Sequence, residues 1–300
     1  MRPLRALVIY VVVVFLGGAL LAPWLYRLAQ IAAAAFPHIA QTPFHRFLDR
    51  SLLLFALAGL WPFLRHLGMV SWCELGLVHP HGQLKNWGGG LLLGFVTLAI
   101  AAGTALGSGD RVLDVNLTAH KIVGTLFNAG ATGIAVSLIE EILFRGGIFG
   151  GLRRTFYWPL ALVASSLIYA LAHFLQRAEL TGPVVWDSGL VLLLRMAGGL
   201  LDFHVLVPGF FSLALAGSLL GLAYQRTGNL YFSIGLHTGW IFWLKMYGAF
   251  TADAPSAPPG FRGTGRLIDG WPALLVLALT LAIFEFLPLK VVREPFAISR

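Results

Sequence analysis

The chain is poor in charged residues and nearly free of cysteine. Asp, Glu, Lys and Arg together make up 11% of its 300 residues, whereas an average soluble domain carries about 25%. A single cysteine, Cys73, excludes an internal disulfide framework and a cysteine-rich metal site. The sequence also has no internal repeat and no low-complexity linker. Nothing in it indicates a second domain.

Long apolar runs take the place of charge. Hydrophobic residues make up 58% of the chain, and Leu- and Ala-rich runs near the length of a bilayer-crossing helix recur throughout. The alternating pattern of an outer-membrane barrel is absent. We therefore predict an all-α fold, a polytopic helical membrane protein with residues 1–300 in one integral membrane domain. Eight transmembrane helices are expected, at about 6–26, 51–67, 88–107, 122–144, 158–175, 206–224, 229–247 and 270–289.

Two other segments receive a prediction of their own. The apolar piece 188–201 carries Arg195 and a pair of glycines, which favours a re-entrant or interfacial segment over a full crossing. Residues 251–265 are rich in Ala, Pro and Gly, which is typical of a surface loop.

The net charge of +8 has a topological explanation. Its basic residues stand singly or in pairs at the ends of the apolar runs, which fits anchoring at the membrane surface better than a phosphate-binding face. We therefore expect the lipid bilayer as a partner and no nucleic acid. The Ala- and Gly-rich composition favours a prokaryotic cytoplasmic membrane as the location.

Three charged residues interrupt the apolar stretch 122–149, namely Glu140, Glu141 and Arg145. A charge at bilayer depth costs roughly 2.5–3.5 kcal/mol on insertion scales, so such residues are functional candidates. On an α-helix Glu141 and Arg145 lie about 40° apart and can pair, whereas Glu140 lies about 140° from Arg145. Glu141 and Arg145 are thus more readily explained as a structural ion pair. Glu140 is left without that partner and becomes the candidate general base.

Two histidines fall in later apolar segments, His173 and His237. Taken singly, each is as well explained by an ordinary hydrogen bond between helices as by catalysis. Together with Glu140 they make three polar groups in three separate apolar segments. That coincidence predicts one hydrated site inside the membrane.

The order of these residues resembles a known family. The motifs run Glu140-Glu141-x-x-x-Arg145, then Tyr169-x-x-x-His173, then His237. This series is similar to the CAAX protease and bacteriocin-processing (CPBP, or Abi) family, which includes the type II CAAX prenyl endopeptidases. The run from Gly221 to Leu230, with Asn229 near its end, also resembles the family's approach to its third motif. The likeness covers about residues 120–245, the family-like core.

The resemblance implies a glutamate-dependent intramembrane endopeptidase that needs no metal or other cofactor. Glu140, assisted by His173, would activate water, and His237 would stabilise the oxyanion. Glu141, Arg145, Tyr169 and Asn229 would be supporting residues. The substrate would be a membrane-associated peptide or protein; a prenylated C-terminus, a leader peptide and another membrane protein all fit.

One position departs from the family pattern. Family members often carry Asn or a similar polar residue four positions after the third-motif histidine, and this chain has Ile241 there. Asn229, Thr238 and the Trp240 indole are the candidates to replace that donor. The departure puts catalytic activity in question more than it does the fold.

Three alternatives stay open at this point. A catalytically inactive relative would use the same scaffold as a membrane peptide-binding or immunity protein. Two histidines and a glutamate would suit a catalytic zinc ion, but the sequence lacks a His-Glu-x-x-His helix. A transporter would call for repeated halves, and the sequence has none.

Overall fold

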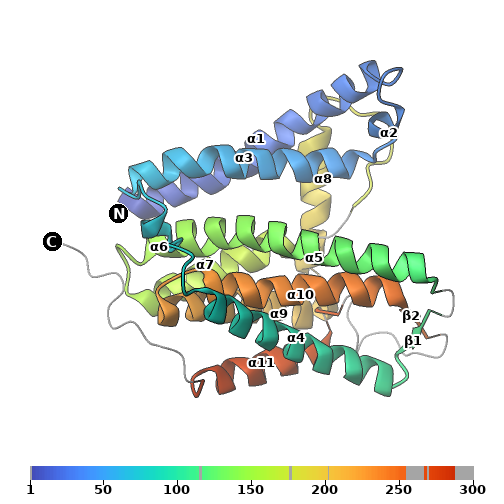
Figure 1. Cartoon of the computed structure of the whole chain (residues 1–300). Coiled ribbons are helices and arrows are strands. Elements are labelled where there is room, and N and C mark those ends of the chain that lie inside the picture. Colours follow the sequence, from blue (N-terminus) through green and yellow to red (C-terminus); the bar gives the residue numbers. More distant parts are fainter. Residues whose placement is uncertain are drawn as a thin grey trace. The chain divides into compact units, whose positions relative to one another are not determined.

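The computed structural model describes residues 2–114, 117–175, 178–201, 203–254, 267–268 and 270–287. Most of these residues are helical, and the sheet among them has two short strands, so the predicted all-α class is confirmed (Figure 1). The elements in chain order are α1 (Arg2–Ile31), α2 (Pro37–Ala40), α3 (Phe44–His66), η1 (Cys73–Leu75), α4 (Leu84–Gly107), β1 (Arg111–Leu113), α5 (Ala119–Glu141), η2 (Ile142–Phe149), α6 (Gly150–Leu152), α7 (Trp158–Phe174), α8 (Ser188–Met196), η3 (Ala197–Leu201), α9 (Phe203–Thr227), α10 (Tyr231–Phe250), β2 (Thr251–Asp253) and α11 (Trp271–Phe284).

The long helices follow the predicted spans. Each of the eight predicted spans overlaps one of α1, α3, α4, α5, α7, α9, α10 and α11. Within the described residues, five helical stretches are long and apolar enough to cross a membrane: Leu4–Ile31, Phe44–His66, Leu84–Gly107, Ala119–Leu152 and Leu206–Thr227. The apolar helices α7 and α11 are shorter. A polytopic helical membrane protein is thereby confirmed, while the number of eight crossings stays a prediction.

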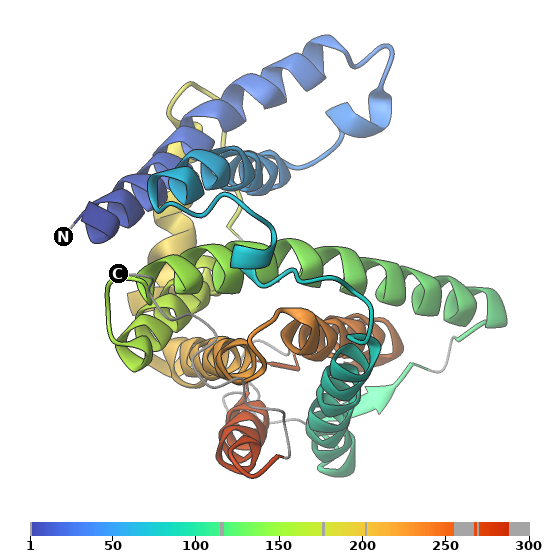
Figure 2. The same ribbon diagram turned by 60° about the vertical axis from the view of Figure 1, so that its left-hand side comes forward.

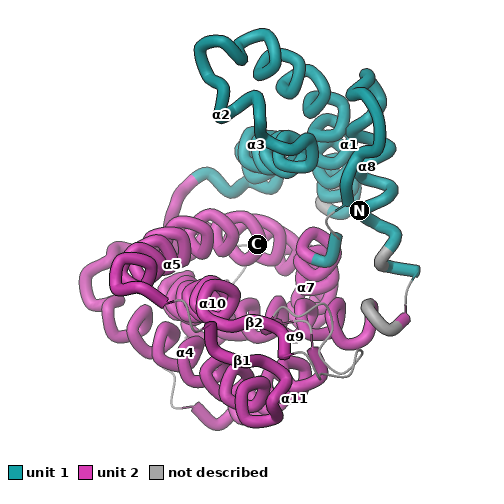
Figure 3. The backbone as a smooth tube through the Cα atoms, turned by 90° about the vertical axis from the view of Figure 1, so that its right-hand side faces the viewer, with its two compact units in different colours: residues 1–70, 174–202 teal, residues 71–173, 203–300 magenta. Residues whose placement is uncertain are grey.

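The described residues group into two compact units, coloured separately in Figure 3. The first comprises Met1–Val70 and Phe174–Asp202, and the second comprises Ser71–His173 and Phe203–Arg300. The single domain expected over residues 1–300 stays a prediction. All of the candidate site residues belong to the second unit.

The first unit is built on α1 and α3, which pack along one another, with α8 against α1. The hydroxyl of Tyr10 on α1 donates a hydrogen bond to the carbonyl oxygen of Ala56 on α3 (2.7 Å). The segment predicted as re-entrant, 188–201, consists of α8 followed by the 3₁₀ turn η3. Its apolar side joins a core made of Ala19, Ala22, Phe44, Leu48, Leu192 and Met196.

In the second unit α10 lies between α4 and α5, which both pack along it (Figure 1). Four glycines make the approach to α4 close: Gly90 and Gly94 on α4, and Gly235 and Gly239 on α10. A Cβ on Gly90 would lie 2.0 Å from Phe232 O, and one on Gly235 would lie 2.0 Å from Trp87 O. Such small-residue pairs, spaced by four, let membrane helices touch backbone to backbone.

Strands β1 and β2 join the ends of α4 and α10. They pair antiparallel, with Arg111 opposite Asp253 and Leu113 opposite Thr251. The loop expected at residues 251–265 is therefore wrong for its first three residues, because β1 offers them backbone partners that composition alone does not reveal. Residues 255–265 of that loop lie outside the described residues.

Helix α5 runs on without a break through η2 and α6, as Figure 2 shows. The whole stretch, Ala119–Leu152, has 34 residues, more than the roughly 20 residues that span a bilayer. At its beginning the Thr118 hydroxyl accepts a hydrogen bond from Lys121 N and caps the first turn. This long helix carries the first of the three motifs.

Candidate active site

The first motif sits where the helical geometry changes. Glu140 and Glu141 are the last residues of α5, and Arg145 lies in η2, which is a π-helix over Ile142–Phe149. The angles expected from regular α-helical geometry are therefore wrong beyond residue 141, because a π-helix has more residues per turn. The pairing they predicted nevertheless forms: Arg145 Nη1 lies 2.9 Å from Glu141 Oε1. π-Helical turns are rare and often occur at functional sites.

The residue that follows α6, Arg153, attaches the end of this long helix to α9. Arg153 Nη1 donates to Gln225 Oε1 (2.9 Å), and its guanidinium lies 4.4 Å from the centre of the Tyr224 ring. Burial lowers the pKa of Arg153 to about 10, so the side chain stays charged at neutral pH. The contacts hold the end of the first-motif helix against a neighbouring element.

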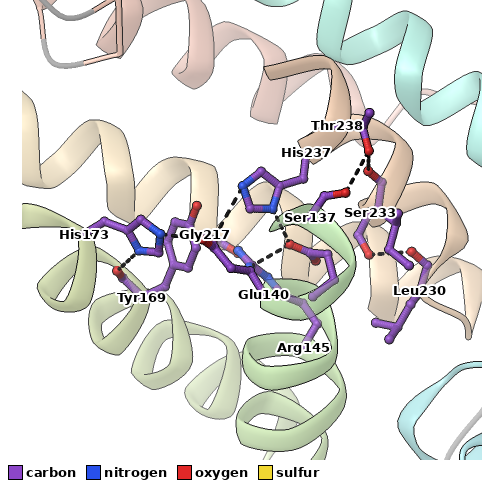
Figure 4. Close-up of polar contacts among 12 residues, drawn as sticks. Ser137, Glu140, Arg145, Tyr169, His173, Gly217, Leu230, Ser233, His237 and Thr238 are labelled. Carbon is purple, nitrogen blue, oxygen red and sulfur yellow. Dashed lines mark hydrogen bonds and ion pairs between the residues drawn. The ribbon is translucent and has the colours of Figure 1, made fainter. Parts of the chain in front are cut away.

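Glu140 lies between the two histidines (Figure 4). Its Oε2 is 3.0 Å from Nε2 of His173 on α7 and 3.7 Å from Nε2 of His237 on α10. The structure thus brings together the three residues that the sequence singled out from three segments. Their catalytic roles stay predictions.

His173 is oriented by its own helix. Its Nδ1 lies 2.9 Å from the backbone oxygen of Tyr169, one turn earlier. A carbonyl oxygen only accepts, so Nδ1 carries a proton and donates it there. A proton must then also lie between Nε2 and Glu140 Oε2, on one atom or the other, because two lone pairs would repel at 3.0 Å. Glu140 and His173 therefore share a proton.

His237 is oriented from a different helix. Its Nδ1 lies 2.8 Å from Glu141 Oε1, so both glutamates of the motif contact this ring. The spacing of Glu141 and Arg145 predicted their ion pair, but it did not indicate this second contact. The signal was the adjacency of the two acids, since neighbours on a helix point about 100° apart and can flank one side chain on a facing helix.

Arg145 and Tyr169 lie beside the carboxylates and contact each other. The guanidinium of Arg145 lies 4.3 Å from the centre of the Tyr169 ring, a cation–π contact, and Nη2 donates to Gly217 O on α9 (3.4 Å). The Tyr169 ring in turn packs against His173, with 4.1 Å between the ring centres and the ring planes tilted by 33°. With Glu141, three of the four predicted supporting residues therefore belong to the central cluster.

Asn229 lies elsewhere. Its Nδ2 donates to Thr227 O (3.0 Å), and its Oδ1 accepts from Tyr231 N (3.1 Å). It therefore shapes the turn between α9 and α10 and begins the helix that carries His237. Both ends of its amide are already used, so it is not available to replace the missing oxyanion donor.

The other two candidate donors are also engaged. The Trp240 indole donates to Thr97 Oγ1 on α4 (2.8 Å). Thr238 Oγ1 donates to Ile234 O (2.7 Å) and lies 2.8 Å from Ser137 Oγ of α5. Thr97 and Ser137 were not singled out from the sequence. For Ser137 a signal existed, because it precedes Glu141 by one helical turn.

A family comparison matches the same part of the chain. Residues 122–243 match the family model described as type II CAAX prenyl endopeptidase Rce1-like. This segment belongs to that family. The family named from the motifs is thus confirmed, and it is one of CAAX-type intramembrane proteases. Comparison with curated proteins and with solved structures gave no match.

The Rce1-like segment contains the whole cluster from Glu140 to His237. Together with the apolar helices it shows an integral membrane protein, and the family implies a membrane-associated peptide or protein as substrate. In the described residues, no group of three or more His, Cys, Asp or Glu side chains is placed to hold a metal ion. Independence from metal stays a prediction.

The side chains of the Rce1-like site differ in exposure. The side chains of Glu140 and His173 are 21% and 29% exposed, whereas that of His237 is 6% exposed. Glu141 and Arg145 are fully or nearly buried. Glu140 and His173 are therefore the partly exposed members of the cluster, while the ion pair of Glu141 with Arg145 is shielded from solvent and lies in a low local dielectric.

Proposed function

We propose that this protein is an intramembrane endopeptidase in which Glu140 activates the attacking water. One observation carries the proposal: a single carboxylate oxygen faces Nε2 of two imidazoles, at 3.0 Å for His173 and 3.7 Å for His237. The contacts of Glu140 with described residues run through Oε2, which leaves Oε1 for a water molecule. A base and a proton donor thus flank one small region, as hydrolysis of an amide requires.

The reaction follows from these positions. Glu140 takes a proton from water, and the water oxygen bonds to the scissile carbonyl carbon. The carbonyl oxygen becomes an oxyanion, which His237 stabilises from Nε2. As the intermediate collapses, the carbon–nitrogen bond breaks and Glu140 returns the proton to the leaving amine. Because the pair shares a proton, His173 can take it from Glu140 or return it, and so change the charge of the base between these steps.

The substrate of this proposal is a peptide that reaches the site from the membrane. The helices that carry Glu140, His173 and His237 are largely apolar, so an apolar anchor on the substrate would remain in lipid while the peptide bond enters. A prenylated C-terminal peptide is the form that the family description names. A leader peptide or a segment of another membrane protein has the same requirement.

The test is cleavage by purified protein of a panel of membrane-anchored peptides, prenylated and unprenylated, with and without chelator. We expect Glu140→Gln to lower the rate by about 10³-fold, within the range of general-base contributions. Glu179→Gln, the same change at an exposed glutamate, is the matched control and should keep the wild-type rate.

Two outcomes would contradict the proposal. Cleavage that survives in Glu140→Gln would remove Glu140 from the mechanism, and cleavage abolished by chelator would revive the zinc reading. Binding of a peptide by a wild-type protein that cleaves none of them would instead favour the inactive relative. That alternative draws on Ile241, which leaves no amide four residues after His237.

A further inference from the structure

We propose that Glu141 is the positioning residue of this site, holding the His237 ring so that Nε2 faces Glu140. The inference rests on the proposed function and assigns to Glu141 a role beyond its ion pair with Arg145. It starts from the contact of His237 Nδ1 with Glu141 Oε1 at 2.8 Å, between residues 96 positions apart.

An imidazole has two ring nitrogens, and in His237 one of them is used by Glu141. The other, Nε2, is 3.7 Å from Glu140 Oε2, beyond hydrogen-bond distance, and is therefore the nitrogen available to a ligand. The ring also forms T-shaped aromatic contacts with Tyr169 and Trp240, at 6.3 Å and 6.4 Å between centres. Those contacts restrain the ring less directionally than a hydrogen bond does.

Glu141 is placed unlike a carboxylate that serves an ion pair alone. Arg145 and His237 both bind its Oε1, at 2.9 Å and 2.8 Å. Its Oε2 is buried and has no hydrogen-bond partner in the part of the chain that the structure describes. An arginine pair by itself favours two parallel bonds to both oxygens. In this structure the two parallel bonds are not formed, and Oε1 lies between the guanidinium and the imidazole.

The charge of Glu141 matters as well as its position. To donate to an oxyanion, His237 needs a proton on Nε2, while a second proton lies between Nδ1 and Oε1. A neutral imidazole carries one proton, so the pair must hold two between them, and the carboxylate stabilises that extra positive charge. A charged donor forms a stronger hydrogen bond than a neutral one. A charged His237 would thereby compensate for the oxyanion donor that is missing at Ile241.

Kinetics of four variants test the inference. Glu141→Ala removes the anchor and should lower kcat by about 100-fold with little change in KM, because His237 acts on the transition state. Glu141→Gln keeps an oxygen for Nδ1 but loses the charge, so it should recover about tenfold of that loss. Arg145→Met breaks the same ion pair from its other end and leaves the anchor in place. Its loss of kcat should be at least tenfold smaller, with Glu179→Gln as the control for wild-type behaviour.

A second measurement does not depend on cleavage. Nitrogen-15 NMR of histidine-labelled protein reports the protonation of each ring nitrogen, with the His237 signals assigned by their loss in His237→Gln. In the wild type, Nδ1 should be in a strong hydrogen bond and both nitrogens should be protonated. In Glu141→Ala the Nδ1 signal should move to the position of an unbonded ring, while Arg145→Met should leave it in place.

The results separate the two proposals. If no peptide is cleaved, the proposed function fails, and the NMR spectra alone decide the role of Glu141. Unchanged His237 signals in Glu141→Ala would overturn the inference whether or not the protein is an enzyme. An equal loss of kcat in Arg145→Met and Glu141→Ala would also overturn it, because a shared structural ion pair would then explain both.

Discussion

The two histidines beside Glu140 are held in contrasting ways. His173 is fixed by a carbonyl of its own helix, Tyr169 O, and is 29% exposed. His237 is fixed by Glu141, a residue of another helix, and is 6% exposed. The α7 side of the site is therefore a product of local helical geometry, while the α10 side depends on how α5, α10 and α4 are packed. Damage to packing should affect the α10 side first.

Removing either imidazole should give the largest fall in kcat and should show whether the two histidines have different roles. We expect His237→Gln to lower kcat by about 10²–10³-fold, the usual loss for one oxyanion donor. His173→Gln should cause a comparable loss but with a changed pH–rate profile, because it removes the group that shares a proton with Glu140. The measurement is kcat against pH for both variants. Identical profiles would contradict the division of roles.

A glycine variant tests whether the α10 side depends on packing. In Gly235→Ala the new Cβ would lie 2.0 Å from Trp87 O, so α4 and α10 must move apart, at a cost of about 1–3 kcal/mol in the free energy of unfolding. We expect thermal unfolding at lower temperature and a fall in kcat of roughly tenfold, since α10 carries His237, the proposed oxyanion donor. Gly248→Ala, on the same helix with nothing within 4 Å, is the matched control. Equal stability of the two variants would refute the argument.

The hydrogen bond between Trp240 and Thr97 should have the smallest effect. Thr97→Val leaves the buried indole N–H without its acceptor, which costs about 1–3 kcal/mol, and Thr97→Ser restores an oxygen. Because the bond joins α4 to α10 three residues from His237, we expect a several-fold fall in kcat in the valine variant and recovery in the serine variant. Thermal unfolding and cleavage rate measure both. If Thr97→Ser lost as much stability and activity as Thr97→Val, the hydrogen bond would not explain the effect.

The sequence predicted what depends on local pattern. Apolar runs indicated the helices, and the spacing of Glu141 and Arg145 predicted their ion pair, which forms even though the helix widens between them. The convergence of Glu140 with two histidines followed from the cost of placing polar groups in a membrane. Each of these inferences used the residues of a single segment, or only the number of apolar segments that contain a polar group.

What the sequence did not reveal depends on register between distant segments. The contact of Glu141 with His237 joins residues 96 positions apart, and its geometry is set by how far α10 is displaced along α5. The π-helix has no local signature in Ile142–Phe149, because its hydrogen bonds differ from those of an α-helix by a single residue. The pairing of β1 with β2 joins segments about 140 residues apart along the chain.

The small sheet has a consequence for the depth of the chemistry. Strand β2 follows directly on α10, and β1 follows α4 after a short turn, so the ladder joins the ends of these two helices. His237 lies 14 residues before Thr251, roughly 20 Å along the helix axis. The paired strands therefore help to fix the position of α10 along its axis, and with it the depth of the imidazole. The sheet would thus affect the proposed chemistry without contacting the site.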